Sequence, residues 1–98
     1  MTVTQKQEDS KLTIAVEGRI DTKTAPELEK VLRASLDGIT ELVFDLAETV
    51  YISSAGLRVL LIAQKQMNKQ GEMKVANVNA DLMEIFVVTG FTEILTIV

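Results

Sequence analysis

The stretch TVYISSAGLRVLLIAQKQM, residues 49–67, contains two adjacent serines between a short apolar run and a long segment with helical spacing. Apolar residues recur every three or four positions from Ser54 to Gln70, which predicts an amphipathic helix. Gly71 follows and is typical of the residue that ends a helix. Ser53 and Ser54 therefore lie where the chain leaves an apolar run and enters its longest predicted helix.

Shorter elements surround this stretch on both sides. Residues 12–16 alternate between apolar and polar, which predicts a strand, and a weaker alternation over residues 3–8 predicts its hairpin partner. Strands that alternate with helices indicate a layered α/β domain with largely parallel pairing. Further strands are predicted over residues 41–46, 73–78 and 94–98.

Polar residues mark the expected helix starts, and one apolar run marks a buried strand. Thr24 stands three residues before Glu27, which predicts a capping box, and Asn79 is expected to cap the last helix. The run from Leu42 to Leu46 is almost continuously apolar and predicts a strand that is buried on both faces. The chain is expected to form a single domain over residues 1–98.

The composition excludes several classes of function. The chain has 98 residues, no cysteine and no histidine, which excludes disulfides, zinc–thiolate sites, thiol catalysis and a Ser–His–Asp triad. Ten basic and 14 acidic side chains give a net charge of −4, and no Lys/Arg cluster occurs, which disfavours nucleic acids and anionic membrane surfaces as partners. No apolar run approaches the roughly 20 residues of a membrane span, and the N-terminus lacks a signal-peptide core, so a cytoplasmic location is expected.

The residues alone leave three roles open for the two serines. Either hydroxyl can cap the helix that follows, since serine is a preferred N-cap residue. Catalysis is disfavoured, because the chain lacks both a histidine to activate a hydroxyl and the G-x-S-x-G pattern of a nucleophile elbow. Phosphorylation is permitted, because the free N–H groups and the dipole of a helix N-terminus favour an added anion.

Three segments resemble one known family. Residues 45–61, DLAETVYISSAGLRVLL, resemble the hallmark of the STAS family of anti-sigma factor antagonists, in which a strand, a short apolar link, an Asp-Ser-Ser-Gly-Leu-like motif and a long apolar helix follow one another. Residues 18–28, GRIDTKTAPEL, resemble a second family element, and residues 90–95, GFTEIL, resemble its closing segment. The resemblance covers essentially the whole chain in order.

The resemblance implies both a fold and a mechanism. The implied fold is α/β, with a single mixed, largely parallel sheet of four or five strands and helices packed mainly on one side. The implied function is partner switching. The unmodified protein binds an anti-sigma factor that is also a serine kinase, the kinase uses ATP to phosphorylate one serine and so ends the binding, and a serine phosphatase reverses the step. The resemblance implies that the chain itself has no enzyme activity and no catalytic residue. It also implies that the chain binds no metal, cofactor, nucleic acid or membrane.

By position, the phosphorylated residue of the family falls on Ser54. Ser53 replaces a family aspartate and is the alternative acceptor, whereas Asp21 matches an aspartate close to the acceptor or else only shapes a turn. Leu57 also fits the core stripe of its helix. The partner-binding residues that the resemblance implies are Asp21, Ile52, Ser53, Ser54, Ala55, Gly56 and Leu57.

Two other functions remain open. A non-phosphorylated STAS scaffold, or an accessory subunit of a stress-sensing or transport complex, keeps the family but not the switch. A small-ligand or nucleotide binder at the rim of the sheet is the third class, although no glycine-rich phosphate loop supports it. Met83 and Val87 lie off the apolar stripe of the last helix and are candidates for a contact patch.

Overall fold

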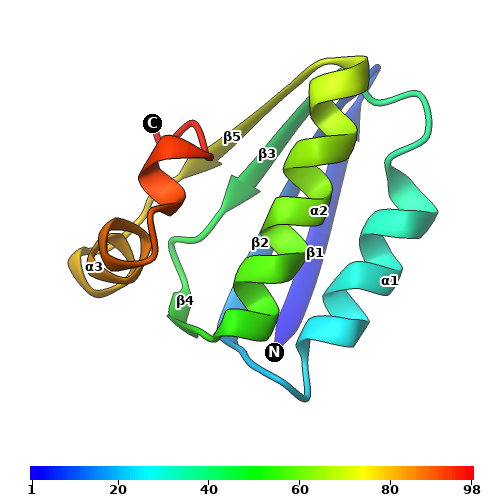
Figure 1. Ribbon diagram of the computed structural model, residues 1–98. Helices are drawn as coiled ribbons and strands as arrows, with labels where there is room; N and C mark the ends of the chain where they lie inside the picture. The colour runs from blue at the N-terminus through cyan, green and yellow to red at the C-terminus, as the bar shows by residue number, and fades with distance from the viewer.

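The structure, a computed structural model, describes all residues 1–98 and contains one five-stranded sheet with three α-helices (Figure 1). The strands are β1 (Thr2–Glu8), β2 (Lys11–Ile20), β3 (Glu41–Asp45), β4 (Thr49–Ile52) and β5 (Glu72–Ala76). The helices are α1 (Ala25–Ser35), α2 (Ser54–Gln70) and α3 (Ala80–Val88), and a 3₁₀ turn, η1 (Phe91–Glu93), follows them. The sheet has the order β1-β2-β3-β5, with β4 also paired to β2. Only the β1–β2 pair is antiparallel, which confirms a mixed, largely parallel sheet.

The helices α1 and α2 lie across one face of the sheet, while the other face is open (Figure 1). On β2, the side chains of Leu12, Ile14 and Val16 are at most 1% exposed and point toward the helices, whereas those of Thr13 and Ala15 alternate to the open face and are half-buried. A single cluster of 23 buried residues fills the space between sheet and helices. This one-sided layering confirms the arrangement that the STAS resemblance implies.

The strand β3 is buried on one face only, so the prediction that both faces are covered is wrong. Phe44 is fully buried beneath the helices, but Val43 is half-buried on the open face. The neighbours of Val43 in register are Thr13 of β2 and Lys74 of β5. Because β3 lies between two other strands, these side chains cover Val43 partly without any helix on that face.

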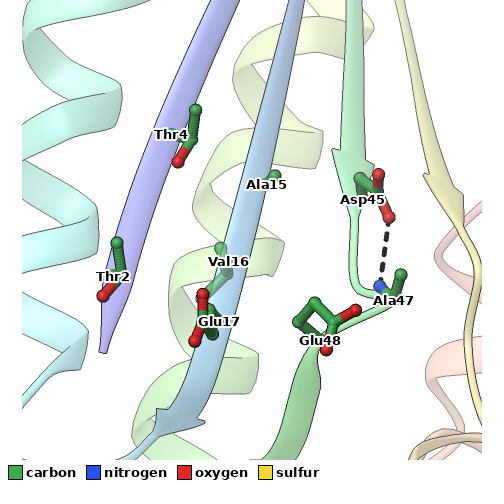
Figure 2. A pocket seen from close by; sticks show the side chains of 8 residues that line it. All are labelled: Thr2, Thr4, Ala15, Val16, Glu17, Asp45, Ala47 and Glu48. Atoms are coloured by element: carbon green, nitrogen blue, oxygen red, sulfur yellow. Dashed lines mark hydrogen bonds between the residues drawn. The ribbon is translucent and has the colours of Figure 1, made fainter.

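The short strand β4 is an element that the sequence analysis did not anticipate. After β3, the side chain of Asp45 accepts a hydrogen bond of 3.0 Å from the backbone N–H of Ala47 and so turns the chain, at the edge of a shallow pocket on the open face (Figure 2). The strand β4 then pairs in parallel with the end of β2, where Gly18, at φ 98°, lies at an irregularity in the register. The buried hydroxyl of Thr49 donates a hydrogen bond of 2.7 Å to the carbonyl of Val16 and ties β4 to β2.

The ends of the other elements follow the sequence prediction in part. The bounds of α2 are as predicted, and the side chain of Asn79 caps α3 by accepting the N–H of Leu82 at 2.9 Å. The prediction of a capping box at Thr24 is wrong, because the Thr24 side chain makes no cap bond and lies within a turn that starts at Asp21. The strand predicted over residues 94–98 is reduced to one parallel bridge between Val75 and Ile97.

Candidate functional site

Ser53 connects β4 to α2, and its N–H, its carbonyl and its Oγ each form a hydrogen bond with a backbone group. Its backbone is extended, at φ −90° and ψ 175°, and its N–H donates to the carbonyl of Ile20 at 2.8 Å. Its carbonyl accepts the N–H of Leu57 at 2.9 Å, and its Oγ accepts the N–H of Gly56 at 3.3 Å. Ser53 is therefore the N-cap of α2, with its side chain half-buried.

Ser54 is the first residue of α2, and its side chain is exposed. Its Oγ forms no hydrogen bond within the protein, in contrast to the Oγ of Ser53, which accepts the cap bond. The two adjacent hydroxyls thus differ in both exposure and bonding. Only Ser54 combines an exposed side chain with an Oγ that has no partner within the protein.

Gly56 allows the first turn of α2 to rest directly on the end of the β2–β4 pair. A Cβ atom at this position would lie 2.7 Å from a side-chain carbon of Ile20, 2.7 Å from one of Ile52, and 3.0 Å from the carbonyl oxygen of Ile20. These distances are too short for any side chain, so the close approach requires glycine. This contact fixes the position of the two serines relative to the sheet.

Asp21 shapes the turn between β2 and α1. Its Oδ1 accepts the backbone N–H groups of Lys23 at 3.0 Å and Thr24 at 3.1 Å, while its own N–H donates to the hydroxyl of Thr24 at 2.8 Å. The backbone hydrogen bond from Thr24 is the main cause that lowers the pKa of Asp21 below its ordinary value, and the nearby Arg19 contributes to the same direction. The carboxylate is thus held ionised near the start of α1.

The structure brings the two turns together at one end of the sheet. The backbone N–H of Ser53 donates to the carbonyl of Ile20. Ser54 follows Ser53 and Asp21 follows Ile20, so the two residues lie next to this bonded pair. Ile52 and Leu57 are buried, at 1% and 5% exposure, and Gly56 is buried between them. Ala55 is half-buried and packs against the core. Ser53 and Asp21 are half-buried at the rim.

A family model described as the STAS domain matches residues 2–98 of the chain. The chain belongs to the STAS family. The protein BtrV of Bordetella bronchiseptica, named for an anti-sigma factor antagonist, is 36% identical over 96 residues, which are 96% of this chain and 83% of BtrV. The anti-sigma-B factor antagonist of Bacillus subtilis is 30% identical over 93 residues, which are 94% of this chain and 85% of that protein.

A solved STAS structure agrees with the fold. The crystal structure of an anti-sigma factor antagonist from Mycobacterium paratuberculosis superposes with a TM-score of 0.88 at 26% identity, covering 98% of this chain and 83% of that chain. The resemblance in the sequence motifs is therefore confirmed over nearly the full length. Membership of the STAS family places the chain among binding modules rather than enzymes.

The structure adds two features to this STAS site that sequence reasoning missed. The guanidinium of Arg19 lies 4.4 Å from the ring centroid of Tyr51 and 3.8 Å from a carboxylate oxygen of Asp21. Arg19 and Tyr51 are register partners in β2 and β4, so recognising β4 as a strand would have placed them side by side. The neighbouring Val50 is exposed by 62% on the same strand.

The predicted contact patch on α3 has one clear member. Val87 is exposed by 61%, whereas Met83 is half-buried.

None of the helices is both long enough and apolar enough to cross a membrane. No group of three or more acidic side chains is arranged to hold a metal ion.

Proposed function

We propose that this chain is an anti-sigma factor antagonist that works by partner switching. In its unmodified form, it binds an anti-sigma factor with serine kinase activity through the rim formed by Asp21, Ser53, Ser54 and Ala55. Phosphorylation of Ser54 ends the binding, and a serine phosphatase restores it. The cycle takes place in the cytoplasm, where sigma factors act.

The observation that carries this proposal is the difference between the two hydroxyls at the start of α2. Ser54 is exposed and its Oγ is free, so a kinase can reach it. Ser53 is half-buried and its Oγ already accepts the cap bond from Gly56, so it is less accessible to a kinase than the free Oγ of Ser54. The proposal therefore assigns the phosphoryl group to Ser54 and keeps Ser53 as the structural residue.

The charge at this rim explains how a phosphoryl group would act on a partner rather than on the fold. A phosphoserine carries about −1.5 to −2 charges at neutral pH, and the free N–H groups at the start of a helix stabilise such an anion. The neighbouring Asp21 is already ionised, because its pKa is lowered by the Thr24 N–H. Two negative groups facing a docked protein can cost several kcal/mol of binding when the partner presents like charge.

Burial narrows the expected partner contacts. Ile52, Gly56 and Leu57 are buried and hold the serines in place. A docked protein would touch the exposed and half-buried members, Asp21, Ser53, Ser54 and Ala55. The three buried residues support the interface from below.

A capture experiment tests the proposal. The Ser54→Ala protein, used as bait in an extract of its own organism, should retain a protein kinase, because it binds and cannot be modified. That captured kinase and ATP should then phosphorylate the unmodified wild-type protein on Ser54, as peptide mapping by mass spectrometry would show. The matched control is Ser53→Ala, which should still be phosphorylated. Modification of Ser53 alone would overturn the residue assignment, and capture of a transport or stress-sensing complex without any kinase would favour the non-phosphorylated scaffold.

A further inference from the structure

Arg58 is the only arginine of the chain without an ionic partner. Arg33 pairs with Glu29 at 2.8 Å, and Arg19 lies 3.8 Å from Asp21. Arg58 is exposed on α2 and forms neither a salt bridge nor a side-chain hydrogen bond within the protein. Its guanidinium is thus a free bidentate donor in the unmodified state.

The surroundings of Arg58 leave it unpaired for a structural reason. It lines a groove between the first turns of α1 and α2, together with Pro26 and Ala55. The one carboxylate that lines this groove belongs to Glu29, and Arg33 already binds it through two N–H groups at 2.8 and 2.9 Å. The groove therefore presents an uncompensated positive charge one helical turn from Ser54.

We propose that Arg58 is the intramolecular receptor of the phosphoryl group on Ser54, an inference that rests on the proposed function. The two residues are spaced i and i+4 on α2, which puts their Cβ atoms roughly 6 Å apart on one side of the helix. The acidic member stands N-terminal to the basic one, which is the favourable order for such a pair. An arginine binds phosphate through two parallel N–H groups, so the pair is well matched in geometry.

Arg19 is the competing receptor near the same rim. Its guanidinium is already stacked on Tyr51 and lies near Asp21. The charge of Arg19 is thus partly compensated in the unmodified protein, whereas that of Arg58 has no ionic partner. The difference in existing contacts favours Arg58.

The consequence is that the switch changes two charges at once. Phosphorylation adds a negative group at Ser54 and removes the free cation of Arg58 from the groove. In the unmodified protein, this cation is available to a carboxylate of the docked partner. The modified protein offers the partner a neutralised arginine and a phosphoryl group in its place.

The test uses protein with phosphoserine installed at position 54 by genetic encoding, so no kinase is required. Phosphorus NMR follows the second ionisation of the phosphoryl group against pH. The second pKa of a free phosphoserine is about 6. A guanidinium nearby favours the dianion, so this pKa should be lower by about 0.2–0.4 pH unit in the wild-type background than in Arg58→Gln.

Two variants make the comparison specific. Arg19→Gln is the matched control and should leave the phosphoserine pKa at the wild-type value, while Arg58→Lys should give an intermediate value. The neighbouring charged residues that stay in place in the Arg58 variants are Arg19, Asp21, Lys23 and Glu29. Circular dichroism of each variant confirms that its fold is retained, as expected for substitution of an exposed residue.

Two outcomes would overturn the inference. One is an equal phosphoserine pKa in the wild-type and Arg58→Gln backgrounds. The other is a shift caused by Arg19→Gln instead, which would make Arg19 the receptor. Neither result depends on whether a kinase modifies Ser54 in the cell, so failure of this inference and failure of the proposed function are distinguishable.

Discussion

Two strand-to-helix turns meet at the same end of the sheet, and they use their polar side chains in opposite ways. The turn from β2 to α1 is closed by Asp21 and Thr24, which bond to each other and to the backbone around them. The turn from β4 to α2 contains one bonded hydroxyl, on Ser53, and one free hydroxyl, on Ser54. The comparison separates the polar side chains that build the rim from the free hydroxyl at the first position of α2.

The largest expected loss of stability comes from a substitution that forces the first turn of α2 away from the sheet. Gly56→Ala would place a Cβ atom 2.7 Å from side-chain carbons of Ile20 and Ile52. Overpacking costs about 1–3 kcal/mol, and the higher helix propensity of alanine offsets up to about 1 kcal/mol of it. We expect a net loss of about 1–2 kcal/mol in the free energy of unfolding, measured by urea denaturation. An unchanged urea midpoint would show that the first turn of α2 does not press on the β2–β4 pair.

The two serines themselves offer the next largest effect. Ser53→Ala removes the N-cap bond to Gly56, which is long at 3.3 Å, so we expect a loss of about 0.5–1 kcal/mol in the free energy of unfolding. Ser54→Ala removes no contact and should change it by no more than a few tenths of a kcal/mol. Thermal and urea unfolding of both variants provides the measurement. Equal losses for both would contradict the distinction between a structural and a free hydroxyl.

The turn at Asp21 gives a smaller effect that depends on pH. The folded state lowers the pKa of Asp21, so the ionised carboxylate stabilises the protein above its unfolded pKa of about 3.9. This contribution is lost as the pH falls through the lower folded pKa. In urea unfolding from pH 6 to pH 3, the wild type should therefore lose more stability than Asp21→Asn, and the gap between the two should narrow toward acid. A gap that stays constant with pH would show that the charge of Asp21 has no part in the turn.

The sequence predicts the layers of the fold better than the details of the rim. The helical spacing over residues 54–70 and the alternation around Ile14 are direct signals of burial on one side, and both elements form as expected. Thr49–Ile52 is missed, although its β-branched and aromatic residues favour a strand. A four-residue strand shows too little periodicity to stand out, and it forms because the far end of β2 is available for pairing.

The sequence predicts where the two serines lie but not how they bond. The motif around Ser54 predicts a site at the start of α2, and the structure has an exposed serine at that position. Which serine caps the helix depends on where the extended backbone ends, and that point is set by the bond from Ser53 to Ile20. The cap expected at Thr24 fails because its hydroxyl bonds back to the carbonyl of Arg19 at 2.9 Å. A contact distant in sequence decides the first case, and the local geometry of a turn decides the second.

The affinity of the kinase captured with the Ser54→Ala bait tests the central claim most directly. Isothermal titration calorimetry would compare its binding to the unmodified protein with its binding to protein that carries phosphoserine at position 54. We predict an affinity at least about 100-fold weaker for the phosphorylated form, which corresponds to about 2.7 kcal/mol. Equal affinities for the two forms would contradict the claim that the free hydroxyl of Ser54 controls docking.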